Sequence, residues 1–217
     1  MELILALDLM QGQAVHGKSG ERSTYRPLVP YSDPINLIAR CAPKSLYIAD
    51  LDRIMGTGAQ DDLVQACALQ VDRCYVDRGC RSPADFLADE AIMNIAGTET
   101  AGDLRRYHGG YVSMDLRDGK VIPSGENPPD FLERVSDLGF EGAIVLNLGA
   151  VGTGTGIPDN LRRLREVYPK RLLYGGGVRG KEDLDPLAAL GFDGTIVATG
   201  VFSGAIPSDA VRRGIWP

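Results

Sequence analysis

The sequence lacks the features that mark several common classes of protein. It has only two histidines, no run of lysine or arginine longer than two residues, and no apolar stretch of 18 residues. A histidine-based metal site or catalytic triad is therefore not expected. A nucleic-acid interface is not expected either, because it needs clustered basic charge and the net charge here is −6. A transmembrane helix needs about 20 apolar residues, so no membrane span is predicted.

Cysteine is also scarce, and none of the four cysteines has the paired spacing of a metal site. We therefore expect reduced, mostly buried thiols, which are typical of a cytoplasmic protein. The N-terminal Met1-Glu2-Leu3 runs directly into a predicted strand, which argues against a signal peptide. We predict a cytoplasmic monomer or small homo-oligomer with no nucleic-acid or membrane partner.

What the chain does contain is a regular alternation of short apolar runs with amphipathic segments. Eight strands are predicted, at residues 3–9, 45–49, 73–76, 91–95, 111–115, 142–146, 171–174 and 194–198. A helix is predicted after each strand, at residues 33–41, 61–69, 82–88, 98–107, 128–138, 158–168, 181–190 and 208–213. Apolar strands that are each followed by a helix indicate a parallel sheet. Eight such units predict an α/β protein with a single (β/α)8 TIM barrel domain, residues 1–217.

An open doubly wound sheet is the alternative, but it normally needs only about five or six strands and does not explain an internal repeat. Asp8 and Gly12 recur as Asp115 and Gly119, at an offset of 107 residues. Other positions recur at an offset of 98: Gly56 with Gly154, Gly79 with Gly177, Arg81 with Arg179, and Asp85 with Asp183. The repeat predicts two half-barrels, about 1–108 and 109–217.

The repeat makes Asp8 and Asp115 symmetry mates. Asp8 ends the first predicted strand and Asp115 the fifth. In a ring of eight strands these positions lie opposite each other at the C-terminal mouth, where barrel enzymes carry their chemistry. A strand-end aspartate can instead cap a neighbouring turn. A facing pair favours general acid–base catalysis, and we therefore predict Asp8 and Asp115 as catalytic residues.

A phosphate site is predicted on the loops after the seventh and eighth strands, at Gly176, Gly177, Thr199 and Gly200. Glycine lets backbone N–H groups approach an anion, and these loops are the usual phosphate cradle of TIM barrels. The alternative is that the glycines only form tight turns. Their position favours phosphate.

The corresponding loops of the first half predict a possible second anion site. In these loops Asp77 and Arg78 replace two glycines of the second half. The site would use Arg78, Gly79, Arg81, Gly97 and Thr98. Equally, Asp77 and Arg78 could form an ion pair that blocks it, because an acid beside a phosphate is costly unless an arginine neutralises it.

Residues 10–32, after the first strand, form a loop far longer than the usual ~2–6 residues. Its glycines and charged residues suit a lid that closes over a ligand. Further substrate contacts are predicted from Lys18 in this loop, from Asp50 after the second strand, and from Gly152 and Thr153 after the sixth.

Together these segments resemble the HisA/HisF superfamily of phosphosugar barrels from histidine biosynthesis, whose barrels are duplicated. The similarity covers essentially the whole chain. It rests on Leu7-Asp8-Leu9, Ala49-Asp50-Leu51-Asp52, Ser113-Met114-Asp115, Tyr174-Gly175-Gly176-Gly177-Val178 and residues 198–204. Residues 15–27 are similar to a related branch of methanogens and C1-metabolising bacteria, near genes for methanopterin-type cofactors.

By this resemblance Asp8 would be the general base and Asp115 the general acid of an isomerase. The reaction would be an aldose–ketose (Amadori) rearrangement of a phosphoribosyl substrate, with no cofactor. Two alternatives are an enzyme acting on a phosphorylated precursor in methanopterin- or methanofuran-type C1 cofactor biosynthesis, and a non-catalytic phosphosugar-binding barrel. The chain departs from the family where Asp77-Arg78-Gly79 replaces a glycine triplet, and where Val151 replaces an aspartate before Gly152-Thr153.

Overall fold

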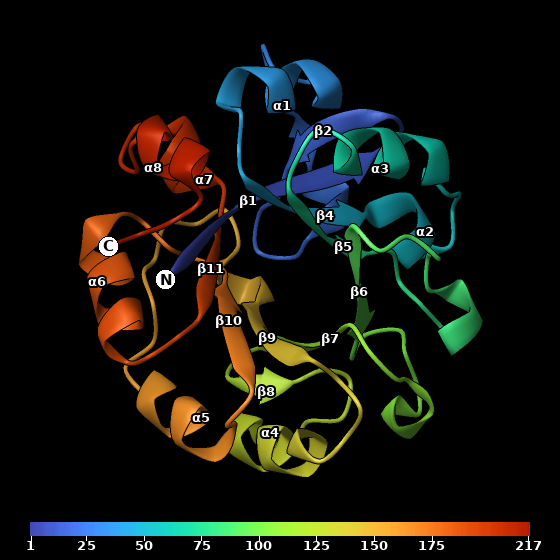
Figure 1. Ribbon diagram of the computed structural model, residues 1–217, viewed down its shortest axis with the longest axis vertical. Helices are drawn as coiled ribbons and strands as arrows, with labels where there is room; N and C mark the ends of the chain where they lie inside the picture. Colours follow the sequence, from blue (N-terminus) through green and yellow to red (C-terminus); the bar gives the residue numbers. More distant parts are fainter.

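Eight parallel strands close into a ring, and the helices lie outside it (Figure 1). The computed structural model describes all residues, 1–217. The strands of the ring, in spatial order, are β1 (Glu2–Met10), β4 (Ser45–Asp50), β5 (Arg73–Asp77), β6 (Ile92–Gly97), β7 (Tyr111–Arg117), β9 (Gly142–Asn147), β10 (Arg171–Gly175) and β11 (Gly194–Val197). β11 pairs in parallel with β1, which closes the barrel. The predicted (β/α)8 TIM barrel is confirmed.

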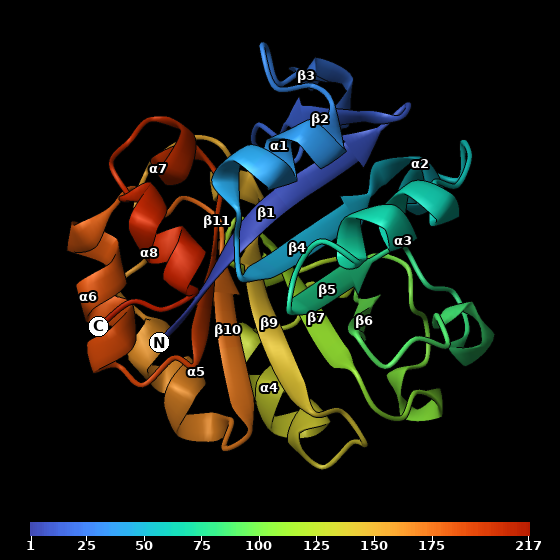
Figure 2. The ribbon, with the colours of Figure 1, turned by 45° about the horizontal axis from the view of Figure 1, so that its top comes forward.

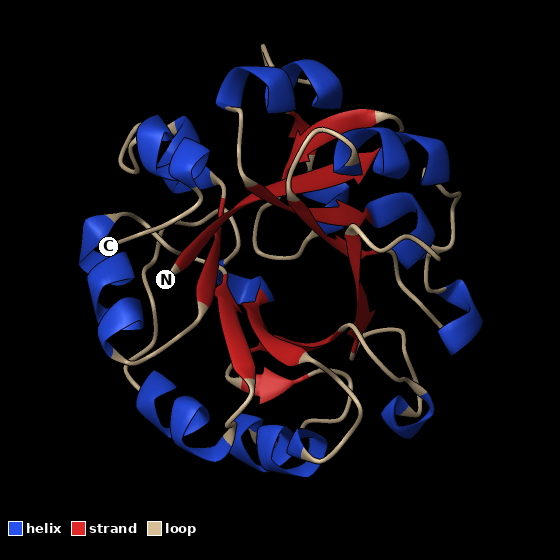
Figure 3. Ribbon diagram, in the orientation of Figure 1, coloured by secondary structure: helices blue, strands red, loops and turns tan.

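Most of the helices cover the outer face of the ring (Figure 3), while the short helices at residues 51–55 and 199–202 line the mouth of the barrel. The helices are α1 (Pro34–Cys41), α2 (Leu51–Met55), α3 (Asp61–Ala68), α4 (Pro128–Ser136), α5 (Leu161–Val167), α6 (Lys181–Ala189), α7 (Thr199–Phe202) and α8 (Ser208–Arg213). Short 3-10 helices form at η1 (Arg22–Thr24), η2 (Pro83–Asp85), η3 (Leu104–Arg106) and η4 (Leu148–Ala150). None of the helices is both long and apolar enough to cross a bilayer.

Two predicted α-helices, at residues 82–88 and 98–107, do not form, and only η2 and η3 lie there. In the first segment the Asn94 side chain forms hydrogen bonds with both the N–H and the carbonyl group of Leu87. Leu87 N–H donates to Asn94 Oδ1 at 2.8 Å, and Asn94 Nδ2 donates to the Leu87 carbonyl at 3.0 Å. In the second, Gly102 has a left-handed φ of +63°, which interrupts a helix. Side-chain bonds to the backbone compete with the helical ladder, so loops cover this part of the barrel.

The strands that end in Asp8 and Asp115 continue into matching hairpins. β1 pairs with β2 (Gln13–His16), and β7 pairs with β8 (Lys120–Val121), both antiparallel. Each turn has two consecutive residues with positive φ, Gln11-Gly12 in the first half and Asp118-Gly119 in the second. Two positive φ angles are the mark of a type I′ hairpin turn. The halves therefore share local geometry at the positions where their sequences repeat.

Alternation along the strands divides the side chains between the barrel interior and the outer layer. A large cluster of 44 buried residues includes the contacts between the ring and its helices. A separate cluster of 14 residues takes at least one side chain from every strand of the ring and fills the interior. These include Ile4, Tyr47, Tyr75, Ile95, Tyr111, Ile144, Leu173 and Ile196. Because the period of a strand is two residues, Asp8, Asp77 and Asp115 point inward as well, closer to the mouth.

Candidate active site

Three aspartates line one cavity at the C-terminal mouth of the barrel. Asp8 comes from β1, Asp77 from β5 and Asp115 from β7. β1 and β7 are four strands apart in either direction around the ring, so Asp8 and Asp115 face each other across the mouth. Asp77 adds a third carboxyl group to the same cavity.

Asp8 has a carboxylate whose oxygens remain available to a ligand. Burial raises the pKa of Asp8 to about 6, and the positive charge of Arg22 opposes this rise. No hydrogen bond from the protein contributes to the shift. Gly17 lies close by: a Cβ built at Gly17 would be 2.6 Å from Asp8 Oδ2. A free carboxylate with a raised pKa is suited to accept a proton near neutral pH.

Asp115, by contrast, is held firmly in place. Ser113 Oγ donates to Asp115 Oδ1 at 2.7 Å. Thr98 Oγ1 and Glu99 N–H donate to Oδ2 at 3.2 and 3.1 Å. Burial raises the pKa of the Asp115 carboxyl group, and these hydrogen bonds oppose the rise. Asp115 therefore has a fixed orientation and an increased affinity for a proton.

Asp77 is also buried, with 7% of its surface exposed. Its Oδ1 accepts a hydrogen bond from Gly79 N–H at 3.1 Å. Burial, followed by the charge of Asp115, raises the pKa of Asp77. The two carboxyl groups flank Gly97: a Cβ built there would be 3.3 Å from Asp115 Oδ2 and 3.3 Å from Asp77 Oδ2. The charge on one of these carboxyl groups therefore affects the titration of the other.

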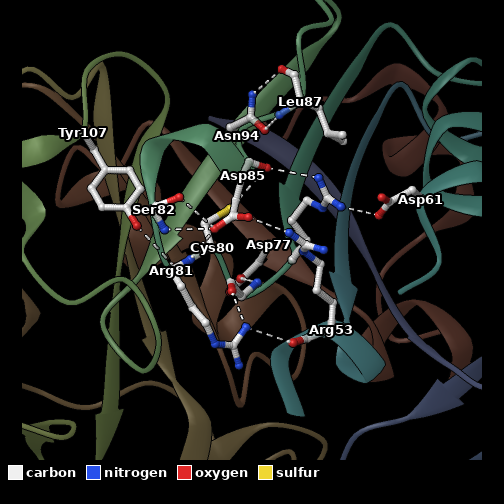
Figure 4. A network of polar contacts seen from close by, with 12 residues as sticks. Arg53, Asp61, Asp77, Cys80, Arg81, Ser82, Asp85, Leu87, Asn94 and Tyr107 are labelled. Carbon is white, nitrogen blue, oxygen red and sulfur yellow. Dashed lines mark hydrogen bonds and ion pairs between the residues drawn. The ribbon is translucent and has the colours of Figure 1, made fainter. Parts of the chain in front are cut away.

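The ion pair between Asp77 and Arg78 that we considered does not form. Arg78 is 4% exposed and pairs instead with Asp61 at the start of α3, and its Nη1 donates to the Asp85 carbonyl at 3.0 Å. Arg81 donates to the carbonyl oxygens of Arg53, Ile54 and Gly79. Figure 4 shows these contacts beside Asp77.

The predicted second anion site therefore does not assemble from its expected residues. Arg78 and Arg81 are occupied by structural contacts and do not line the mouth cavity. Thr98 donates to Asp115, and Gly79 N–H is taken by Asp77. Gly97 lies between two carboxyl groups. Neither of the two arginines expected at this site lines the mouth cavity.

The predicted phosphate cradle has the required backbone geometry. Gly176 and Gly177 line the cavity with φ of +104° and +79°. A Cβ would be 2.3 Å from the Asn147 carbonyl oxygen at Gly176, and 2.7 Å from the Gly156 carbonyl oxygen at Gly177. Only glycine fits both positions. The N–H groups of Gly176 and Gly177 donate to no other backbone group, so they are available to an anion.

Of the other two predicted cradle residues, one lines the cavity and one does not. Thr199, the first residue of α7, lines the cavity. Gly200 is buried below the surface, where a Cβ would be 2.7 Å from the Arg179 carbonyl oxygen. Gly200 therefore allows α7 to pack closely against the preceding loop.

The long loop after β1 covers part of the mouth. It forms β2 and β3 (Arg26–Pro27), which extend β1 as an antiparallel sheet beyond the ring (Figure 2). Arg22 forms a two-pronged ion pair with Glu99 after β6, with N–O distances of 2.7 and 2.5 Å. Ser19 N–H donates to the Val151 carbonyl after β9 at 2.8 Å. The segment that contains Arg22 thus bridges two loops of the mouth and lies over Asp8.

Of the four predicted substrate contacts, only Gly152 lines the cavity. Lys18 is exposed, and Thr153 donates to the Ala150 carbonyl at 2.8 Å. Asp50 is fully buried on the outer side of β4, where it caps α2 and accepts the N–H groups of Arg53 and Gln60 at 3.2 and 3.0 Å. Its orientation follows from alternation, because Ala49 faces the interior.

The structure adds four cavity residues that the sequence analysis did not select. Arg22 and Glu99 form the ion pair described above, while Tyr25 and Tyr47 supply phenol groups. Burial, followed by the charges of the three aspartates, raises the pKa of Tyr47. Inward alternation on the second strand would have identified Tyr47. Nothing in the sequence pairs Arg22 with Glu99, because 77 residues separate them.

Comparisons with known proteins agree with this architecture. A family model described as "Histidine biosynthesis protein" matches residues 2–207. An uncharacterized protein of Methanocaldococcus jannaschii is 30% identical, and the match covers 97% of each chain. Two relatives, from Thermus thermophilus and Haloarcula marismortui, are each 28% identical over 95% and 96% of this chain and 96% and 94% of their own. Both are named as isomerases of an imidazole-4-carboxamide that carries two 5-phosphoribosyl groups. The match over nearly the whole chain places the protein in the histidine biosynthesis family, the HisA/HisF superfamily that the sequence motifs indicated.

Proposed function

We propose that the protein is an isomerase that carries out an aldose–ketose (Amadori) rearrangement of a phosphoribosyl substrate. The observation that carries the proposal is the pair of inward-facing carboxyl groups, Asp8 and Asp115, on opposite sides of one cavity. The glycine cradle at Gly176 and Gly177 lies in the same cavity and suits the phosphate. The isomerase names of the two 28% identical relatives support the reaction class.

The two carboxyl groups suit different steps of this reaction. Asp115, protonated, would donate to the ring oxygen of an N-linked aldose, which breaks the bond from C1 to the ring oxygen and leaves an iminium at C1. Asp8, ionised, would then remove the proton from C2 to give a neutral enolamine. Return of a proton to C1 and loss of the proton from the C2 hydroxyl, which restores the acid form of Asp115, complete the ketose. The ring oxygen and C1 each gain a proton while C2 and its hydroxyl each lose one, so substrate and product have the same composition.

The surroundings of each aspartate support this assignment. Asp8 has free oxygens and a pKa of about 6, so it is mostly ionised at neutral pH yet basic enough to accept a proton. Burial, with the charge of Glu99 behind it, raises the pKa of Asp115, which favours retention of a proton, and the fixed orientation of its carboxyl group suits donation. Microscopic reversibility gives the opposite roles in the reverse reaction.

The test is turnover of a phosphoribosyl aldose by the wild type and by Asp8→Asn and Asp115→Asn. Removal of a general acid or base typically costs about 10²–10⁴-fold in rate, and we expect a kcat loss in this range for each variant. Asp72→Asn, an exposed carboxylate remote from the mouth, is the matched control and should keep full activity. Unchanged activity in both cavity variants would show that the assigned mechanism is wrong.

A second candidate is the same chemistry on a different phosphorylated substrate, such as a precursor in methanopterin- or methanofuran-type C1 cofactor biosynthesis. The observation that favours a different substrate is Asp77, which stands where the second half has glycine. A purely binding function, without catalysis, is less well supported. Phosphate binding alone needs the glycine cradle but gives no reason for an unbonded, partly buried carboxylate at Asp8.

A further inference from the structure

The loops after β5 and β10 occupy matching positions in the sequence repeat, so their differences can be compared residue by residue. At the offset of 98, Asp77, Arg78 and Gly79 correspond to Gly175, Gly176 and Gly177. The loops end alike: Asp85 accepts the N–H of Arg81 at 2.9 Å, and Asp183 accepts that of Arg179 at 2.8 Å. Gly79 and Gly177 both have positive φ, of +62° and +79°. The backbone therefore agrees at Gly79 and Gly177, but it differs at the preceding residue, because Gly176 has a φ of +104° and Arg78 is not in the left-handed region.

In the second half, the N–H of Gly177 is available to an anion. In the first half, the equivalent N–H of Gly79 already donates to Asp77 Oδ1 at 3.1 Å. The Asp77 carboxylate thus occupies the donor that a phosphate oxygen would use. The protein supplies its own anion at this position, and a second anion from a ligand would meet both a lost donor and a negative charge.

The charges around Asp77 reinforce this effect. The cavity contains four carboxyl groups, Asp8, Asp77, Glu99 and Asp115, and one arginine, Arg22. Arg22 is already paired with Glu99 through two hydrogen bonds. The arginines of the loop itself, Arg78 and Arg81, donate to backbone carbonyl groups and do not line the cavity. No cation is therefore free to neutralise a phosphate beside Asp77.

Asp77 nevertheless retains capacity to bind a ligand. Only its Oδ1 accepts a hydrogen bond from the protein, and the side chain is more than nine-tenths buried with its carboxyl group lining the cavity. Asp77 Oδ2 has no donor from the protein and is not sealed from the cavity, so a ligand that enters can donate a hydrogen bond to it. Groups that can do so are hydroxyl, amine and amidine N–H groups.

We propose that the cavity is built for a substrate with a single phosphate, held at Gly176 and Gly177, whose opposite end is unphosphorylated and donates hydrogen bonds to Asp77. That such a substrate is isomerised rests on the proposed isomerase function. That the cavity binds a substrate with one phosphate does not depend on it. It distinguishes this protein from its 28% identical relatives, whose named substrate carries two phosphoribosyl groups. Asp77 is then the residue that sets specificity between the two substrate classes.

The test compares a sugar with one phosphate, ribose 5-phosphate, and a sugar with two, ribulose 1,5-bisphosphate, by isothermal titration calorimetry. We expect the wild type to bind the bisphosphate no more than about threefold more tightly than the monophosphate. Asp77→Gly restores the glycine of the second half and should strengthen bisphosphate binding by about tenfold or more, with little change for the monophosphate. Asp77→Asn, which keeps the shape of the side chain, should give a smaller gain in the same direction. Asp72→Asn serves as the control.

Three results would overturn the inference. The first is a wild type that binds the bisphosphate more than about threefold more tightly than the monophosphate. The second is the absence of any gain in bisphosphate affinity in folded Asp77→Gly and Asp77→Asn. The third is a wild type that binds neither sugar phosphate. The comparison is independent of turnover: single-phosphate binding by a protein without isomerase activity would refute the proposed function alone. Turnover of the relatives' substrate with two phosphoribosyl groups would support the isomerase and refute this inference.

Discussion

Asp8→Asn is expected to make the folded protein more stable while it removes activity. The folded-state pKa of Asp8 is about 6, compared with an ordinary value of 3.8, because burial disfavours the charged form. The protonated form is therefore favoured by folding. The stability contributed by Asp8 is fully present below about pH 3.8 and is lost as the pH rises through about 6. At pH 8 the wild type carries an ionised Asp8 that destabilises the fold, and a neutral asparagine removes this cost.

The magnitude follows from the size of the shift. A shift of roughly two pKa units corresponds to about 3 kcal/mol, since each unit is worth about 1.4 kcal/mol. Asp8 is partly exposed at the mouth, so we expect a gain of about 1.5–3 kcal/mol in the free energy of unfolding at pH 8. For a chain of this size, the gain raises the melting temperature by roughly 4–10 °C. At pH 5 the advantage should fall to about half.

The assay is thermal and urea unfolding of the wild type and Asp8→Asn, followed by circular dichroism at pH 8 and pH 5. Asp72→Asn is the control, because its side chain is 72% exposed and pairs only with Lys44 at 3.7 Å. Its stability should stay within about 0.5 kcal/mol of the wild type at both pH values. If Asp8→Asn is not more stable at pH 8, or if its advantage does not shrink at pH 5, the cost that we assign to the Asp8 charge is wrong.

Three further predictions concern the cavity. Because a general base must be ionised, kcat/KM should fall by about tenfold per pH unit below about pH 6, and this acidic limb should report Asp8. Arg22→Ala or Glu99→Gln should break the ion pair across the mouth, and the rate of amide hydrogen exchange in residues 16–25 should increase by roughly threefold or more. Arg105→Ala, which removes an exposed ion pair elsewhere, should leave this exchange rate unchanged. Gly177→Ala should weaken ribose 5-phosphate binding by about tenfold or more, because φ is +79° and a Cβ would meet backbone at 2.7 Å; unchanged affinity would exclude this loop as the phosphate site.

The sequence predicted the ring of strands well because its signal is local. Each strand is a short apolar run bounded by glycine or polar residues, and all eight form close to the expected bounds. The predicted helices at residues 82–88 and 98–107 were wrong for different reasons. In the first segment, Asn94 on the next strand binds the backbone of Leu87, and no periodicity within the segment reveals this partner. In the second, Gly102 is a local signal that interrupts a helix, and Asp115 of the next strand also binds the backbone of Glu99.

The residues of the candidate site also fall into those that a local sequence pattern reveals and those that depend on distant partners. Asp8 and Asp115 were recognisable because each ends a strand in a repeated context, and the structure brings them to one cavity. Asp77 carried the same strand-end signal, but its neighbour Arg78 suggested an anion site or an ion pair. Which way Arg78 turns depends on Asp61, 17 residues away on α3. Asp50 was expected at the mouth, and only the inward position of Ala49 fixes it on the outer side.

The absence of two helices beside the mouth also has an electrostatic consequence. In a (β/α)8 barrel each helix begins near the C-terminal end of the preceding strand, and its N-terminus carries a partial positive charge. The units that follow β5 and β6 lack such helices, and they adjoin the carboxyl groups of Asp77 and Glu99. The opposite side of the mouth, at β10 and β11, is followed by α6, α7 and α8. The two sides of the mouth therefore offer different electrostatic environments: helix N-termini at β10 and β11 favour the negative end of a ligand, and carboxyl groups without such helices at β5 and β6 favour a neutral or positive end.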